Sequence, residues 1–389
     1  MIARAIAAGF FCFAATAWAP SEAAAYGFFK CDDGGNYTRT TTLSLAAKWK
    51  TLRPLINLHT VSFPSGSANR AAAQAAIARW NFGPQGLQYS TGFSSTPTFG
   101  PGDKISHIAF ATPPTVCAAT DNACAPITYS CSAGITEVDI VLQSTVPFTT
   151  SEMKSGHFAY GGGGQELRDT LIHELGHTLG LAHTANVYNV MGDAARHFHT
   201  NGPFAFAYPG SDDVSGAVAL YGTRSGAGAN VGVSHWRWCR AGTGTSPISI
   251  HCYVRVLDRT SGLEVPSAPR SAGSGERVYD VRRNQSVRLE LTFENMGVVN
   301  HALLETGFYF STDDNISTAD LKLLTSLFNY NRGAPDTRLT NLVIPTQDKN
   351  GNALVTNRTY FLGAIADDLN RLSESDENNA TYVPIRIVN

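Results

Sequence analysis

One eleven-residue stretch, 173–183, reads H-E-L-G-H-T-L-G-L-A-H and constrains this chain more than any other. His173 and His177 are four residues apart, so a helix would place both imidazoles on one face, where they can bind one ion. Glu174 is placed to polarise a metal-bound water instead of binding the metal. A glycine then lets the chain leave the helix, and His183 supplies a third nitrogen. Three protein ligands and one open position are typical of catalytic zinc, so the stretch predicts a zinc peptidase site.

The residues around this motif predict helices and strands that would hold it. Leu167, Leu171 and Leu175 recur every four residues and predict an apolar stripe that anchors the motif helix. A second helix is expected over 68–80, with Ser67 as its N-cap. Strands are expected over 55–63, 105–111 and 135–142.

The first 25 residues predict a secretory signal peptide. Arg4 is followed by an apolar run over 5–19, and three alanines at 23–25 offer a cleavage site before Tyr26. The run is too short to predict a membrane span. We therefore expect export, to a periplasmic or extracellular location, with loss of residues 1–25.

Six of the seven cysteines follow this segment, and in an exported protein they predict three disulfides. Cys239 with Cys252 is the favoured pair, because a predicted hairpin separates them. Cys31 would then pair within a cluster of three cysteines. The cluster consists of Cys117, Cys124 and Cys131. A second metal site is the alternative interpretation, but no second cysteine or histidine pattern has zinc-finger spacing.

Length and charge limit the class of protein. A chain of 389 residues predicts two domains, and 43% hydrophobic residues are enough for folded cores. Lys and Arg number 29 against 31 Asp and Glu, without a basic patch, so no nucleic-acid partner is expected.

The motif is followed by Met191, in the sequence Asn-Val-Met-Gly, and with it resembles the metzincin clan of zinc peptidases. Residues 211–222, S-D-D-V-S-G-A-V-A-L-Y-G, are similar to the last catalytic-domain helix of matrixins; Ser211 is expected to cap this helix and Gly222 to end it. The resemblance covers about 50–223. It implies an α+β catalytic domain over 26–223, with a mixed twisted sheet, long helices and zinc in the cleft, above a methionine turn.

Other matrixin features match less well. No pro-segment is recognised, and Cys31 is interpreted as a disulfide cysteine instead of an inhibitory switch. Ca²⁺ is considered but not supported, because the calcium ligand set does not match. Tyr208 is interpreted as part of the substrate-pocket wall, and His197 and His199 as surface or loop histidines.

The composition changes after residue 223, and residues 224–264 predict a linker that carries a disulfide-stapled hairpin. From 265 to 389, short alternating strands predict an all-β immunoglobulin-like sandwich. Segments 308–313, 360–367 and 374–379 resemble the CARDB family. That resemblance implies a bacterial module of extracellular proteins, for which we expect a cell-surface or extracellular ligand. The acidic run 374–377 could bind calcium, but a solvated turn before the last strand is the default interpretation.

These observations predict a secreted zinc endopeptidase that hydrolyses peptide bonds of protein or peptide substrates by attack of a zinc-bound water activated by Glu174. The alternative is a catalytically inactive extracellular binding or adhesion protein that retains the zinc site. The intact Glu174 favours the enzyme. A metal assay combined with a generic protease substrate would separate the two.

Overall fold

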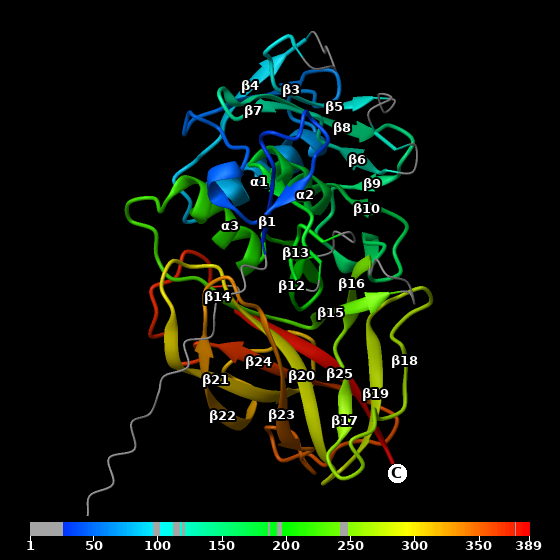
Figure 1. Cartoon of the computed structure of the whole chain (residues 1–389). Helices are drawn as coiled ribbons and strands as arrows, with labels where there is room; N and C mark the ends of the chain where they lie inside the picture. The colour runs from blue at the N-terminus through cyan, green and yellow to red at the C-terminus, as the bar shows by residue number, and fades with distance from the viewer. Residues whose placement is uncertain are drawn as a thin grey trace, which may run out of the picture.

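The computed structural model describes residues 26–95, 102–111, 117–118, 121–185, 187–192, 197–241, 248–377 and 379–389. The predicted signal peptide, residues 1–25, lies outside them. The described chain forms an α+β domain followed by an all-β domain (Figure 1), as predicted. None of the described helices is both long and apolar enough to cross a membrane.

A mixed sheet forms one side of the first domain. Its strands run in the order β4-β3-β5-β8-β6, and β7 also pairs with β8. Neighbours among β3, β4, β5 and β8 are parallel, whereas β6 and β7 are antiparallel to β8. Their bounds are Leu55–His59 (β3), Ser90–Ser94 (β4), His107–Ala111 (β5), Ala123–Cys124 (β6), Ile127–Ser130 (β7) and Gly134–Gln143 (β8). β8 is almost wholly buried, as expected for a central strand covered on both faces.

The described part of this domain has three α-helices: α1 (Ala68–Phe82), α2 (Leu167–Thr178) and α3 (Ser211–Tyr221). α2 contacts β6 and β8 of the sheet, whereas α3 lies beside β11. The predicted cap of α1 is confirmed, since Ser67 Oγ accepts a hydrogen bond from the Arg70 amide at 3.2 Å. α1 and α2 pack together, and the Trp80 indole donates to the Ile172 carbonyl at 2.9 Å. The stripe of α2 therefore anchors the motif helix as its periodicity predicted.

The predicted cap of α3 is wrong. Gly210 occupies the N-cap position and Ser211 is the first helical residue. The Gly210 amide donates to the Asp213 carboxylate at 2.8 Å, and the Ser211 amide donates to Glu294 of the second domain at 3.1 Å. Both orphan amides are satisfied by carboxylates, so the serine hydroxyl is not needed as a cap. Gly222 ends the helix with φ +70°, as predicted.

Short strands of two to four residues complete the first domain. β1 and β11 pair beside the motif helix, and β12 and β13 form a hairpin next to the second domain. The strands are β1 (Gly27–Phe29), β2 (Arg39–Thr40), β9 (Phe148–Thr149), β10 (Gln165–Glu166), β11 (Leu181–Ala182), β12 (Phe198–Asn201) and β13 (Phe204–Ala207). Single 3-10 turns lie at Leu43–Leu45 and Lys154–Gly156.

The second domain is a sandwich of two sheets. One has the order β18-β19-β25-β24-β21-β22, and the other joins β14, β17 and β23 to the central strand β20. The bounds are β14 (Val231–Ser234), β15 (Trp236–Ala241), β16 (Ile248–Tyr253), β17 (Val256–Asp258), β18 (Ser267–Pro269), β19 (Arg277–Arg282), β20 (Ser286–Asn295), β21 (His301–Ser311), β22 (Leu321–Tyr330), β23 (Asp336–Val343), β24 (Thr359–Ala366) and β25 (Ala380–Val388). β15 and β16 form the expected hairpin.

Two strands of this sandwich come from residues 224–264, which the sequence analysis assigned to a linker. β14 and β17 both pair with β20, antiparallel to it. Their partner β20 begins only at Ser286, well after both strands, so the local composition carries no sign of the pairing. We therefore propose that the second domain begins near residue 231 instead of 265.

Three disulfides join the six described cysteines. Cys239 pairs with Cys252 across the β15–β16 hairpin, which confirms the favoured pair. Cys31 pairs with Cys131, inside the predicted cluster, and Cys117 pairs with Cys124.

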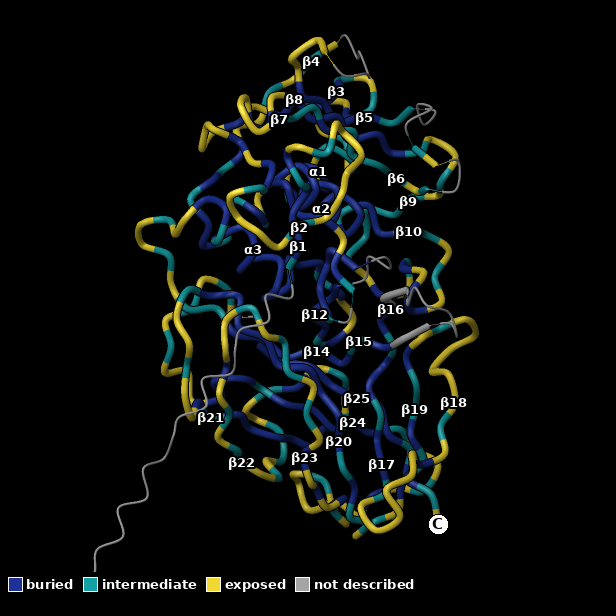
Figure 2. Tube along the Cα trace, in the orientation of Figure 1, coloured by how far each residue is buried: buried dark blue, intermediate teal, exposed yellow. Residues whose placement is uncertain are grey.

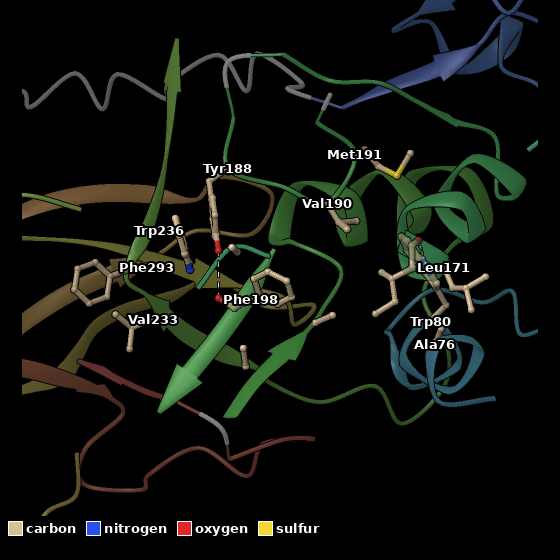
Figure 3. Close-up of a cluster of buried hydrophobic side chains, with 14 of the residues drawn as sticks. Ala76, Trp80, Leu171, Tyr188, Val190, Met191, Phe198, Val233, Trp236 and Phe293 are labelled. Carbon is tan, nitrogen blue, oxygen red and sulfur yellow. Dashed lines mark hydrogen bonds between the residues drawn. The ribbon is translucent and has the colours of Figure 1, made fainter. Parts of the chain in front are cut away.

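One hydrophobic core runs through both domains. α2, α3 and β14 are almost wholly buried, although the residues that connect α3 to β14 are exposed or half-buried (Figure 2). Figure 3 shows buried side chains of α1, of α2, of the segment after the motif and of the second domain, all of which belong to one cluster. The labelled members are Ala76, Trp80, Leu171, Tyr188, Val190, Met191, Phe198, Val233, Trp236 and Phe293. The contact between the domains therefore consists of buried apolar side chains from both of them.

Candidate metal centre

Helix α2 presents the first two histidines of the motif. Leu167, Leu171 and Leu175 are fully buried, which fixes the rotation of the helix about its axis. His173 and His177 then lie on one face, with their ring centroids 4.7 Å apart. Four residues of a helix make one turn, so the spacing in the sequence is enough to pair them.

A tight turn brings the third histidine back to this face. The helix ends at Thr178, and Gly180 takes φ +94°, where a side chain would be strained and would also collide with the Ala47 carbonyl. The next two residues form β11, and His183 follows it. His183 is exposed, whereas His173 and His177 are 8% and 9% exposed, so the cluster opens to solvent at the third histidine.

The three imidazoles converge on one point. His183 Nε2 lies 3.1 Å from His173 Nε2 and 3.1 Å from His177 Nε2. The far nitrogens of the helical pair are engaged with backbone carbonyls, since His173 Nδ1 lies 2.6 Å from Val190 O and His177 Nδ1 2.9 Å from Leu181 O. A carbonyl oxygen only accepts, so both of these Nδ1 atoms carry the proton and donate it to the carbonyl. The Nε2 atoms of His173 and His177 then keep free lone pairs, which point into the cluster. Three converging lone pairs fit a cation.

Burial keeps these imidazoles neutral. Burial, followed by the neighbouring His183, lowers the pKa of His173 to about 3. Burial and the two other histidines lower the pKa of His177 well below its usual value. Neutral imidazole is the form that binds a transition metal, so the site fits Zn²⁺ in protonation state as well as in donor type.

Glu174 lies beside the cluster on the same helix. Its side chain is 5% exposed, and its Oε2 atom has no hydrogen-bond partner among the described residues. Burial, with a smaller contribution from Asp121, raises the pKa of the carboxyl to about 8. A carboxyl group with a pKa near neutrality can both accept and release a proton.

Met191 lies under the motif helix. A Cβ placed on Gly176 would collide with Met191 Sδ and lie 3.2 Å from Trp80 Cζ2, so the glycine allows this close packing. The turn that carries the methionine is held by Asp213, whose carboxylate accepts from the Val190 amide at 2.8 Å and the Met191 amide at 3.3 Å. Asp213 was not among the predicted site residues. A carboxylate three positions after Gly210 is a signal of a helix start. The Met191 amide, which donates to the same carboxylate, lies 22 residues earlier in the chain, so the local sequence does not show this contact.

The structure places the remaining predicted site residues at the domain contact. Tyr208 is buried; its hydroxyl donates to Asp376 at 2.6 Å, and the Arg79 guanidinium lies 4.0 Å from its ring centroid. Its place in the wall of a substrate pocket stays a prediction. His197 lies in a loop, directly before β12, as one of the two alternatives predicted, whereas His199 lies within β12. The surface alternative is wrong for both, because they are 0% and 1% exposed.

The acidic segment 374–377 also lies at this contact, and only part of it is solvated, since Ser375 and Glu377 are exposed whereas Glu374 and Asp376 are half-buried. Glu374 accepts a hydrogen bond from the Val231 amide at 2.7 Å, and Asp376 forms an ion pair with Arg79 of α1 at 2.8 Å. The run is charged because it faces the basic and amide groups of other segments, which the local sequence does not show.

Helix, converging imidazoles and buried carboxylate together define a candidate metal-dependent hydrolase. The matrixin family model matches residues 17–222 of the chain, which is more than half of its length. The chain therefore belongs to the matrixin family of metallopeptidases, and the resemblance seen in the histidine motif is confirmed.

Solved structures add a distant similarity. An NMR structure of a CARDB domain from Pyrococcus furiosus is 16% identical and covers 28% of this chain and 85% of its own, with a TM-score of 0.21. A crystal structure of the same domain in complex with di-metal ions is 13% identical and covers 41% and 90%, with a TM-score of 0.24. The comparison with curated proteins found no match. The second domain is defined here by its own strand pairing.

Proposed function

We propose that the chain is an exported zinc endopeptidase in which His173, His177 and His183 hold Zn²⁺ and Glu174 transfers protons. One observation carries the proposal: the three Nε2 atoms converge beside a buried carboxyl, while two of the Nδ1 atoms are bound to backbone carbonyls. The matrixin family membership agrees with this reaction class. The three disulfides support an oxidising compartment, as does the pattern of residues 1–25.

Zinc bound at this site would supply a Lewis acid for water and for the scissile carbonyl. Glu174 takes a proton from the attacking water as the new C–O bond forms. It then delivers that proton to the amine nitrogen as the C–N bond breaks. A dication next to Glu174 favours its carboxylate and lowers its pKa from the metal-free value, which prepares it to act first as a base.

Glu174→Gln tests this role. The glutamine side chain has nearly the size of the glutamate it replaces but cannot accept the proton. We therefore expect the zinc content of the parent and a fall in casein cleavage of roughly 10²–10⁴-fold. Glu166→Gln is the matched control, a second buried glutamate at the start of the same helix, and should retain cleavage. Cleavage by Glu174→Gln at the rate of the parent would contradict the mechanism. A parent protein that holds zinc but cleaves no member of a broad peptide library would favour the inactive binding protein.

We also propose that the second domain binds a surface or the protein substrate. Leu324 and Leu327 are 37% and 54% exposed on β22, the outermost strand of its sheet. The two side chains project from opposite faces of β22, so the proposed contact is the edge of this strand between them, where backbone groups can pair with another chain. Leu324→Glu/Leu327→Glu should leave cleavage of a short peptide unchanged. A loss with casein alone would indicate substrate contact, whereas no change with either substrate would argue against that role.

A further inference from the structure

Two histidines of the first domain and one glutamate of the second meet inside the domain contact. His197 directly precedes β12, His199 lies within it, and Glu294 lies near the end of β20. The three are 0%, 1% and 1% exposed. Residues two apart in an extended chain point to the same side, so both imidazoles reach the same carboxylate. His197 Nε2 lies 2.9 Å and His199 Nε2 3.1 Å from the single atom Glu294 Oε2.

This cluster has the dimensions of the first one. In both, the three ligand atoms all lie within 4.8 Å of one another. In the first cluster the His183 Nε2 atom lies 3.1 Å from each of the other two Nε2 atoms; in the second the Glu294 Oε2 atom lies 2.9 and 3.1 Å from the two Nε2 atoms. Ligands about 2.0–2.1 Å from a tetrahedral zinc are about 3.3 Å apart, so an ion requires only a small expansion of either cluster.

The surroundings hold three further carboxyl groups. The Asp169 carboxylate accepts a hydrogen bond from the His197 amide at 3.3 Å. A Cβ placed on Gly210 would lie 3.0 Å from Asp213 Oδ2 and 3.2 Å from His197 Nε2, so these two groups face each other across the glycine. Asp212 is also buried, and its Oδ2 accepts from the Asn189 side-chain amide at 3.1 Å. With Glu294, four carboxyl groups therefore lie near the two imidazoles in the protein interior, a setting that suits a cation.

The ligands are also held in position. Glu294 Oε1 accepts from the Ser211 amide at 3.1 Å, which leaves Oε2 for the cluster. The His199 ring stacks on Tyr208 with centroids 4.9 Å apart, and its Nδ1 would lie 3.0 Å from a Cβ placed on Gly232. Gly232 pairs directly with Glu294 across β14 and β20, so its lack of a side chain makes room for the imidazole.

We propose that His197, His199 and Glu294 form a second zinc site, which fastens the C-terminal sandwich to the peptidase domain. Two imidazole nitrogens and a carboxylate oxygen are an ordinary donor set for Zn²⁺. Because the three ligands are fully buried and come from both domains, the ion has a structural role and does not meet substrate. The proposal goes beyond peptide hydrolysis, and either site can be present without the other.

Metal content of the purified full-length protein, measured by mass spectrometry, tests the proposal. The parent should hold two zinc ions per chain, His173→Ala one, Glu294→Gln one, and the double variant none. Glu290→Gln is the matched control, since Glu290 is a buried glutamate of the same strand that pairs with Arg255 and Arg237. It should retain two ions.

One zinc in the parent and none in His173→Ala would overturn the second site, while the proposed function would stand. Two ions in both the parent and His173→Ala would instead count against the catalytic site. If Glu294→Gln fails to fold, His173→Ala still decides the question, because its second cluster is intact. Removal of its one zinc by a chelator should then lower its melting temperature, and re-addition of zinc should restore it. An unchanged melting temperature would contradict a fastening role.

Discussion

Burial of ionisable side chains governs the behaviour of individual residues around the metal centre. Glu166, at the N-cap of α2, is 4% exposed and receives one hydrogen bond, from the Arg168 amide to Oε1 at 3.4 Å. Burial, followed by repulsion from Asp169, raises the pKa of its carboxyl to about 8. The start of the motif helix therefore carries a carboxyl group that is protonated at neutral pH.

Glu166→Gln should stabilise the protein at high pH only. The unfolded carboxyl ionises near pH 4.5 and the folded one near 8, so the unfolded state of the parent gains stability as pH rises between these values. Glutamine does not ionise, so the variant should exceed the parent by roughly 1–3 kcal/mol at pH 8 and match it near pH 4. Urea unfolding at both pH values measures the difference, with the exposed Glu377→Gln as control. An advantage of equal size at both pH values would contradict this account.

Gly176→Ala should disturb the metal centre although alanine favours helices. The added methyl group meets Met191 Sδ and the Trp80 ring in a packed interior, so we expect a loss of about 1–3 kcal/mol and weaker zinc binding. Gly163→Ala is the control, since a Cβ there has no neighbour within 4 Å. Denaturant unfolding and zinc titration check both variants, and equal effects of the two would refute the packing argument.

At the scale of elements, the N-terminal strand supports the turn that carries the third histidine. β1 pairs with β11 through Gly27 and Ala182, and the Phe29 ring lies 5.5 Å from the His177 ring. Cys31, two residues further on, is tied to Cys131. The disulfide thus holds β1 against the metal centre and leaves no free thiol for a switch.

Loss of the Cys31–Cys131 bridge should cost more stability than loss of Cys117–Cys124. The bridges span 100 and 7 residues, and the longer loop restricts the unfolded chain more, by about 2 kcal/mol in the chain-entropy model. Paired Cys→Ala variants, compared by urea unfolding, measure the difference. Only the Cys31–Cys131 variant should also lose zinc more readily to a chelator. A larger effect from the short bridge would contradict the model.

At the scale of the whole molecule, the two domains share polar contacts as well as a core. Tyr160 of the first domain accepts from the Trp236 indole at 3.0 Å, and Thr381 of β25 donates to the Thr200 carbonyl at 2.9 Å. Lys154 lies 3.8 Å from Glu276, a buried pair across the contact. Such a contact predicts that the domains unfold together.

Asp376→Ala should weaken this coupling. Asp376 accepts from Arg79 at 2.8 Å and Tyr208 at 2.6 Å, and its loss leaves a half-buried arginine and a buried hydroxyl without that acceptor. We expect a loss of about 1–2 kcal/mol and a broader calorimetric transition. Glu377→Ala, its exposed neighbour, is the control and should behave as the parent. A parent-like transition for Asp376→Ala would mean that the ion pair does not couple the domains.

The metal centre was predictable because its signal is local. His173, His177 and Glu174 lie within one turn of a helix, and His183 follows after a short turn, so the spacing along the chain is almost the spacing in space. The same holds for the caps at Ser67 and Gly222, and for the alternation that predicted the C-terminal strands. The periods of a helix and of a strand predict which side chains share a face, and this prediction needs no knowledge of the rest of the fold.

Tertiary structure decided everything that depends on partners far apart in the chain. His199 meets Glu294 across 95 residues, Tyr208 meets Asp376 across 168, and β14 joins the second domain by pairing with β20. The motif and its chemistry were thus determined by the sequence alone, whereas the second histidine cluster and the domain contact were not. A periodic pattern reports which face of an element is apolar, but only packing reports which distant carboxylate lies opposite a buried imidazole.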